Sequence, residues 1–266
     1  MTHRPALLLA ALLLSALPAG AEEQQELSYV LGAGLAHGPE YPGARRSDSG
    51  PTLLWALRWG RWRISTSGAG ALLGFGREIA GPGASTELFS DDKFSLGLSL
   101  RMDSGRDSGD ASSTSGLPDV RRTLRGRLFA RYELAPDWLL AGAVSQDLMG
   151  RQGGLQTQLD LGWRLHRSES SEWTLGLGLS AADGRNMRSY FGVTPAGAIA
   201  SGLPEYRPGA GLRDVHAGLG WTRSLGPHWV VYATGGFSRL LGPAADSPLS
   251  QRPSGSHFGL GLAYRN

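Results

Sequence analysis

The sequence predicts an all-β fold, a transmembrane antiparallel up-and-down β-barrel that follows a cleaved signal peptide. Three observations predict it: an export signal at the N-terminus, segments of about ten residues in which apolar residues alternate with polar or small ones, and connections that are alternately short and long. The composition agrees, because 40 glycines and only 18% charged residues suit a β-rich chain with many tight turns better than a soluble helical enzyme.

The N-terminus has the parts of a secretory signal peptide. A short basic start precedes an apolar run over residues 6–17, and the small residues at 19–21 form a cleavage signal. We expect residues 1–21 to be removed, which leaves residues 22–266 as one barrel domain. An uncleaved anchor is the alternative, although the apolar run is short for a bilayer, which takes about 20 residues. The chain has no cysteine, so an exported protein must be stabilised in another way, such as a closed barrel.

Period-two alternation identifies the strands. From Leu155 to Leu165 the odd-numbered residues are Leu, Thr or Trp, whereas the even-numbered ones are polar or glycine. Successive strand residues point to opposite faces, so such a segment has one apolar face and one polar or small face. A soluble β-sandwich would also alternate, but segments of about ten residues have the length that a tilted strand needs to cross a bilayer.

This alternation predicts twelve strands with both termini on the periplasmic side. The pair within residues 61–92 is the least regular, so ten strands is the alternative count. The expected strands lie near residues 26–36, 51–59, 61–68, 70–77, 93–102, 120–134, 138–146, 155–166, 172–182, 211–225, 228–238 and 256–265.

The connections and the tryptophans set the two ends of the barrel apart. Long connections near residues 37–50, 103–119, 183–210 and 239–255 are rich in Gly, Ser, Pro and Asp, and they are expected to be the outer loops. The short turns are expected in the periplasm. The eight tryptophans lie close to these short turns and on the apolar parity of the strands, which predicts an aromatic girdle at the membrane interface. They are Trp55, Trp59, Trp62, Trp138, Trp163, Trp173, Trp221 and Trp229.

Four charged residues on one strand are candidates for the lumen. Arg125, Arg127, Arg131 and Glu133 have the parity opposite to that of Leu128. A charge on the lipid face costs about 2–4 kcal/mol near the midplane for Arg or Lys, so these side chains should face the interior. A functional interpretation is an anion-selective or ligand-binding interior. The structural interpretation, which we favour, is a charge ladder that solvates or plugs a narrow lumen.

No catalytic, cofactor-binding or metal-binding residue is evident, and we expect the protein not to be an enzyme. The formal net charge of +3 gives no case for nucleic acid. There is no Gly-x-Ser-x-Gly elbow, and no histidine has a serine or carboxylate at a spacing that indicates a triad. The aspartates of the 103–119 loop lack the ligand order of a calcium loop, so we expect them to be solvated. A lipid hydrolase is therefore the least favoured function.

Three loop motifs have plausible structural roles of their own. Tyr41, Pro42 and Gly43 form a tight turn, in which Pro fixes φ and Gly supplies a positive φ. A second motif places two aromatic residues in a long loop that could fold over or into the barrel mouth; it consists of Tyr190, Phe191 and Gly192. In the third, an Asp side chain could hold a turn; its residues are Asp246, Ser247 and Pro248.

The same motifs carry a family resemblance. The stretches are Gly32 to Gly34 with Pro39 to Gly43; Tyr190 to Thr194 with Ser201 to Pro204, Tyr206 and Gly211 to Val215; Arg239 to Gly242 with Ala245 to Pro248; and Gly259 to Tyr264. Together they resemble the MltA-interacting protein (MipA)/OmpV family of outer-membrane proteins over essentially the whole chain. One departure is the end of the chain, where Arg265 and Asn266 follow the closing aromatic residue.

The resemblance implies a non-enzymatic scaffold in the outer membrane. Such a protein would contact outer-membrane lipid and link a lytic transglycosylase to a peptidoglycan synthase. It implies no cofactor and no catalytic residue. A small-solute pore remains the alternative function, since a lumen of twelve strands can be filled or open.

Overall fold

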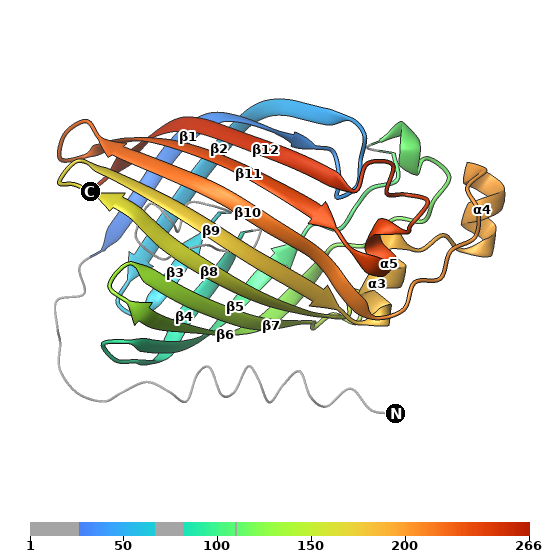
Figure 1. Ribbon diagram of the computed structural model, residues 1–266, viewed down its shortest axis with the longest axis horizontal. Coiled ribbons are helices and arrows are strands. Elements are labelled where there is room, and N and C mark those ends of the chain that lie inside the picture. The colour runs from blue at the N-terminus through green and yellow to red at the C-terminus, as the bar shows by residue number, and fades with distance from the viewer. Residues whose placement is uncertain (1–26, 67–81, 110) are drawn as a thin grey trace.

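The computed structural model describes residues 27–66, 82–109 and 111–266 as a closed barrel of twelve antiparallel strands (Figure 1). Each strand pairs with its neighbours in sequence, and β1 closes the barrel against β12. The expected signal peptide at 1–21 and the expected strand near 70–77 lie outside the described residues. The strands are β1 (Ser28–Pro39), β2 (Ser47–Trp59), β3 (Trp62–Ser65), β4 (Gly83–Ser90), β5 (Phe94–Asp103), β6 (Thr123–Ala135), β7 (Trp138–Asp147), β8 (Leu155–Arg167), β9 (Ser171–Ala182), β10 (Gly211–Ser224), β11 (Trp229–Leu240) and β12 (Ser254–Arg265).

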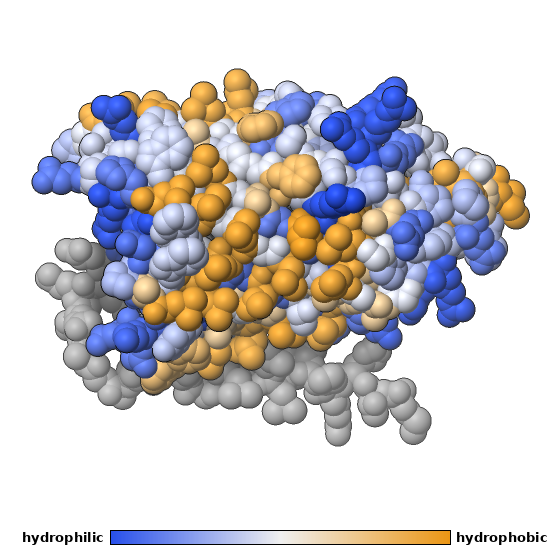
Figure 2. Space-filling view, in the orientation of Figure 1, coloured by the Kyte–Doolittle hydropathy of each residue, from blue (hydrophilic) through white to orange (hydrophobic). Residues whose placement is uncertain are grey.

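The outer surface of the barrel is apolar along the strands. Leu53 is 78% exposed and Leu35 is 69% exposed, although both lie in the middle of hydrogen-bonded strands. Figure 2 shows apolar side chains gathered across the middle of the visible face, with hydrophilic residues towards both ends. An apolar band of this kind, with its edges polar, is the surface that a barrel presents to lipid. Among the described residues, no helix is long and apolar enough to cross a membrane.

The two ends of the barrel differ, as expected. At what we call the turn end, short turns join the strands, whereas at the loop end the connections are long (Figure 1). The first long connection is shorter than expected, because Pro39 pairs with Ser47 and the two strands extend towards the loop end. Cross-strand register brings tryptophans together at the turn end, in the pairs Trp59–Trp62, Trp138–Trp163 and Trp173–Trp221.

The fourth strand lies where the sequence did not predict it. It is Gly83–Ser90, which pairs with β3 on one side and β5 on the other. A β-bulge between Glu87 and Phe89 breaks the alternation, and the consecutive residues Leu88 and Phe89 are 50% and 52% exposed. A segment whose parity changes halfway gives no clean period-two signal.

The C-terminal residues complete the seam between the first and last strands. The backbone N–H of Tyr29 donates to Oδ1 of Asn266 (2.6 Å), and Nδ2 of Asn266 donates to the carbonyl of Leu27 (2.8 Å). The Arg265 side chain donates to the hydroxyl of Ser224 (3.0 Å). Asn266 therefore extends the seam by side-chain hydrogen bonds, whereas the Arg265 side chain reaches the end of β10.

An apolar cluster fills the lumen beside this seam. It consists of Val30, Leu54, Ala56, Tyr232 and Ala263. The Tyr232 side chain lies over two glycines of the neighbouring strands, Gly34 and Gly261, where a Cβ atom would be 2.7 Å and 2.3 Å from its hydroxyl oxygen. These glycines make room for an inward aromatic side chain.

We expect Gly261→Val to destabilise the barrel by about 1–3 kcal/mol, because the new side chain overlaps the Tyr232 ring. The measurement is the midpoint of denaturant unfolding of the detergent-folded protein. Gly235→Val is the matched control, since Gly235 lies on β11, where a Cβ atom would meet Phe258 at an ordinary 3.5 Å. Equal midpoints for the two variants would show that a side chain at position 261 does not disturb the packing of the Tyr232 ring.

Candidate functional site

The connections at the loop end fold into a cap over the barrel mouth (Figure 1). Their described residues contain three helices and a 3₁₀ turn, where the sequence indicated irregular loops. These are η1 (Ser112–Thr114), α3 (Gly184–Phe191), α4 (Pro195–Ser201) and α5 (Gly242–Ala245). The Asp183 side chain caps α3 by accepting from the N–H of Asn186, and Thr194 caps α4 by accepting from the N–H of Gly197.

Apolar clusters hold the cap together, and two of them contain the most residues. In the first, Met187 and Phe191 of α3 are 0% and 2% exposed and pack with Leu240 and Ala244. The second joins three separate connections, with Leu117, Val193 and Leu249 all buried. Because each cluster draws residues from distant parts of the sequence, the cap is a small core of its own.

The three sequence motifs meet in this cap. The hydroxyl of Tyr41 donates to the carbonyl of Leu249 (3.2 Å), and the hydroxyl of Ser247 donates to the carbonyl of Phe191 (2.6 Å). The carbonyl of Gly43, whose φ is +97°, accepts from the N–H of Arg252 (3.0 Å). In the third motif the side chain that holds the turn is Ser247, which accepts from the N–H of Leu249 (3.1 Å), and not the aspartate that the sequence suggested.

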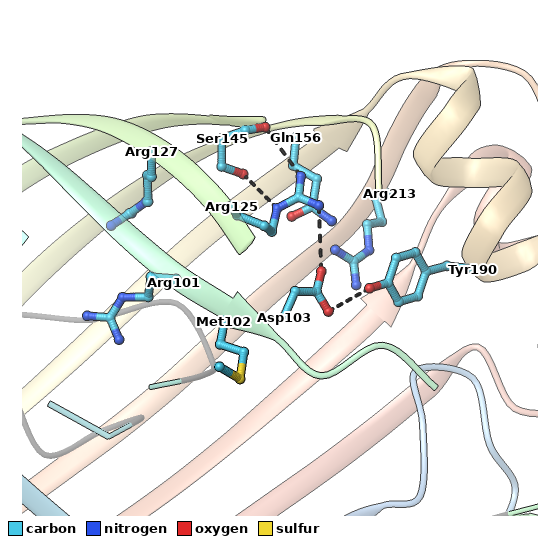
Figure 3. Close-up of a pocket in the computed structure, with 9 residues that line it drawn as sticks. All are labelled: Arg101, Met102, Asp103, Arg125, Arg127, Ser145, Gln156, Tyr190 and Arg213. Atoms are coloured by element: carbon cyan, nitrogen blue, oxygen red, sulfur yellow. Dashed lines mark hydrogen bonds and ion pairs between the residues drawn. The ribbon is translucent and has the colours of Figure 1, made fainter. Parts of the chain in front are cut away.

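A cavity of about 140 Å³ lies in the lumen beneath the cap (Figure 3). Four arginines and one aspartate contribute to its wall, and Arg101 and Arg125 are only 3% and 4% exposed. The lining residues are Arg101, Met102, Asp103, Arg125, Arg127, Ser145, Gln156, Tyr190 and Arg213.

Arg125 serves chiefly to hold the wall of this cavity. Its guanidinium donates to the carbonyls of Gly153 (2.9 Å), Gly154 (3.0 Å) and Ser145 (3.3 Å). Nη1 also lies 3.5 Å from a carboxylate oxygen of Asp103. Since a buried guanidinium needs acceptors for its five donors, Arg125 fixes the connection between β7 and β8 against the lumen.

Tyr190 connects the cap to the cavity. Its hydroxyl donates to Oδ1 of Asp103 (2.7 Å), and the guanidinium of Arg213 lies 5.9 Å from the centre of its ring. Burial, with the neighbouring Asp103 carboxylate second, raises the pKa of the Tyr190 hydroxyl well above its ordinary value. The hydroxyl therefore stays a donor to Asp103 throughout the physiological pH range. Asp103 is thus half-buried and paired, where the sequence suggested a solvated loop residue.

The four charged residues proposed for the lumen lie along β6. Arg125 is buried, whereas Arg127, Arg131 and Glu133 are half-buried, and Leu128 on the opposite parity is 47% exposed. Only Arg125 and Arg127 reach the cavity. Towards the turn end, the Arg131 guanidinium lies 3.8 Å from Glu87, which also pairs with Arg63 at 2.7 Å.

Sequence reasoning missed the other charged residues of the cavity. Arg101 has the polar parity of its strand, so the same parity argument that found Arg127 could have found it. Arg213 gave no such signal, because a register shift between Leu212 and Asp214 disturbs the alternation at the end of β10.

A histidine between two carboxylates also lies in the lumen. His216 on β10 contacts Asp214 through Nδ1 and Asp160 through Nε2, both at 2.9 Å. The hydroxyl of Ser180 donates to Asp214 at 2.5 Å. A hydrolytic triad requires the serine to hydrogen-bond to the imidazole, whereas here the serine bonds to the carboxylate. The cluster therefore lacks the arrangement of a serine hydrolase.

Known proteins differ in how closely they match this chain. No curated protein sequence matches the chain. Among solved structures it is similar to a KdgM porin in complex with disordered oligogalacturonate, with 11% identity, a TM-score of 0.42, and 89% of this chain and 98% of that chain covered. It is also similar to an anion-selective porin from Comamonas acidovorans, with 11% identity, a TM-score of 0.41, and 91% and 99% covered. Such distant likenesses concern the fold and carry no conclusion about ligands.

The family comparison is more specific. A family model described as MltA-interacting protein MipA matches residues 31–266, from the first strand to the end of the chain. The matched region includes most of the seam, the cap and all three loop motifs. The chain therefore belongs to the MltA-interacting protein MipA family.

Proposed function

We propose that the chain is a non-enzymatic scaffold of the outer membrane that binds a lytic transglycosylase and a peptidoglycan synthase. The observation that carries the proposal is the family match over residues 31–266, since the family is named for interaction with MltA, a lytic transglycosylase. The barrel fold is consistent with a binding rather than a catalytic role, and the serine of the His216 cluster is not placed for nucleophilic attack.

The orientation follows from the two ends of the barrel. In outer-membrane barrels short turns lie in the periplasm and long loops outside, which supports the same orientation for a chain with the expected export signal. The partners are periplasmic, so we assign their binding surface to the turn end. Charged side chains surround this end: Arg164 lies 3.9 Å from Asp137 and 3.7 Å from Glu172, and Arg167 is 68% exposed. The turns are short, which favours a small and transient contact.

The test is binding of the lytic transglycosylase from the same organism to the full mature chain in lipid nanodiscs. We expect saturable binding that weakens several-fold in the variant Arg167→Glu, because Arg167 is 68% exposed and exposed charges at an interface steer association. The matched control is Ile199→Asp, at the tip of α4 on the opposite end, where the side chain is 89% exposed. Equal binding by both variants would place the contact elsewhere, and no binding of either enzyme by the unaltered chain would refute the scaffold.

A second candidate function is a pore for small solutes, and the arginine-lined cavity favours it. A lumen lined by arginines would pass small anions in preference to cations. Single-channel conductance in planar bilayers measures this directly. If the chain binds neither enzyme but forms anion-selective channels, the pore function replaces the scaffold function.

A further inference from the structure

The two edges of the apolar band have different chemistry. All eight tryptophans lie towards the turn end, where amphipathic rings anchor a barrel to the membrane interface. At the loop end, arginines border the apolar surface of β6 and β7, and two of them, Arg122 and Arg151, are accessible to solvent. The loop end therefore meets the membrane surface with positive charge in this part of the barrel.

Arg122 lies directly beyond the lipid-facing residues of β6. Leu124 and Leu128 have the outward parity of this strand, and Arg122 has the same parity one step further towards the loop end. Between them Thr123 is buried, and its hydroxyl donates to Asp147. The Arg122 side chain is exposed. A long basic side chain at such a position covers apolar surface with its stem and keeps its charge at the level of the lipid headgroups.

An apolar pair in the β7–β8 connection continues the lipid-facing surface of β6. The N–H of Leu148 donates to the carbonyl of Leu124 (2.9 Å), and a Cβ atom at Gly126 would be 3.0 Å from the Leu148 side chain. Leu148 therefore packs on the outer face of β6. Leu148 and the next residue, Met149, are 40% and 51% exposed, so they extend the apolar band towards the loop end.

The same connection fixes Arg151 beside Arg122. The Arg151 guanidinium donates to the carbonyl of Arg122 (2.6 Å). Asp147 holds the connection from the inner side, because its carboxylate accepts from the N–H groups of Met149 and Gly153 (2.9 Å each). A guanidinium has five N–H donors, so the bond to the carbonyl positions Arg151 without using up its capacity.

Helix α3 brings a third arginine to this connection. The hydroxyl of Ser189 donates to the carbonyl of Gln152 (2.7 Å), and Nδ2 of Asn186 donates to the carbonyl of Gly153 (2.7 Å). Arg185 precedes Ser189 by one helical turn, so the two residues share a helix face, and the Arg185 side chain is exposed. Three positive charges from three parts of the sequence therefore gather at this edge of the apolar band.

We propose that Arg122, Arg151 and Arg185 bind the phosphate groups of an anionic lipid of the outer leaflet, whose acyl chains lie on Leu148 and Met149. Guanidinium groups match phosphate oxygens in a planar fork, and clusters of basic residues at a membrane surface attract anionic headgroups. The exposed apolar pair favours a lipid over free phosphate, because acyl chains bind to neighbouring apolar surface. The proposal shares the orientation of the barrel with the scaffold but not its binding surface, since the partners are assigned to the turn end.

The experiment is native mass spectrometry of the full mature chain in a neutral detergent, titrated with lipid A that carries two phosphate groups. We expect a saturable lipid adduct, and the same lipid A without its phosphates should bind at least about fivefold more weakly. Inorganic phosphate at the concentration of the lipid should displace little of it. The variant Arg122→Gln/Arg151→Gln should weaken lipid binding by about tenfold, because two charge-assisted contacts are lost. Neither enzyme partner is present, so the result does not depend on the scaffold function.

The matched control is Arg45→Gln/Arg46→Gln, which removes two exposed arginines at the same end of the barrel. Residues 47–52 separate this pair from Leu53, the next large apolar residue along the chain, so the pair lies away from the lipid-facing surface. The control should change the affinity for lipid A by less than about twofold, because charges at that distance are screened.

Three results would overturn the proposal. Lipid A without phosphates could bind as tightly as lipid A, or inorganic phosphate could displace lipid A at equal concentration, which would identify free phosphate as the ligand. The control could also weaken binding as much as Arg122→Gln/Arg151→Gln, which would show a general charge effect instead of a site. If the double variant fails to fold, Arg122→Gln decides against Arg46→Gln, with an expected loss of about threefold. Arg122→Lys, which keeps the charge, should then bind more tightly than Arg122→Gln.

Discussion

Phe191→Ala is expected to open the loop cap while the barrel stays closed. The Phe191 ring is 2% exposed and packs between α3, α5 and the end of β11, so its removal leaves a void in the main apolar cluster of the cap. Truncation of a buried phenylalanine typically costs about 3–5 kcal/mol. The loss falls on the cap, because Phe191 lies in a connection and not in the hydrogen-bonded barrel wall.

The measurement is the rate of proteolysis within residues 183–210 of the detergent-folded protein, which should rise by at least about tenfold. Electrophoresis with and without boiling should still show a folded barrel. Ile199→Ala is the control, since this side chain is 89% exposed at the same end. If cleavage of the Phe191 variant is no faster than that of the control, the cap does not depend on this cluster.

Leu128→Arg is expected to destabilise the barrel in lipid. Leu128 lies in the middle of β6 with its side chain 47% exposed on the apolar surface, and it pairs with Leu98 and Val144. An arginine at this depth costs about 2–4 kcal/mol when it faces lipid. The free energy of folding into bilayers of defined composition, obtained from denaturant titration, should fall by that amount.

Arg127→Leu is the control for this register, because it places an apolar residue on the inner face of the same strand. We expect the Arg127→Leu barrel to insert and to show the boiling-dependent shift on a gel. If Leu128→Arg inserts normally and Arg127→Leu does not, the two faces of β6 are exchanged, since a shift of one residue moves every side chain to the other face.

Periodicity was sufficient for most of the barrel because lipid and lumen impose opposite demands on successive residues. Between Leu155 and Leu165 nothing interrupts the alternation, and β8 begins at Leu155. The strand Gly83–Ser90 was missed because its bulge places Leu88 and Phe89 on the outer surface in succession. The helices of the cap were missed for another reason: α3 has eight residues and α4 has seven, too short for a helical period to stand out.

The candidate site was harder to predict than the wall that carries it. Parity placed Arg125 and Arg127 on the inner face. It does not show which inward residues of different strands lie at the same height along the barrel axis and can therefore meet. His216 meets Asp160 only because β8 and β10 flank β9 in register, and the two residues are 56 positions apart. Asp103 was similarly hidden, because its partner Tyr190 is 87 residues away in a loop.

The seam between β1 and β12 also sets the order of the folding steps. The hairpins at the turn end close over a few residues, whereas the bond between Tyr29 and Asn266 joins positions 237 residues apart. The entropy lost on closing a loop grows with its length, so this pairing is the last and slowest to be favourable. Until it forms, β1 and β12 each present a row of unsatisfied backbone groups, which the hydrocarbon interior does not tolerate. Closure and entry into the bilayer are therefore one concerted event, and a chain cut short before β12 keeps an open edge however well its hairpins have formed.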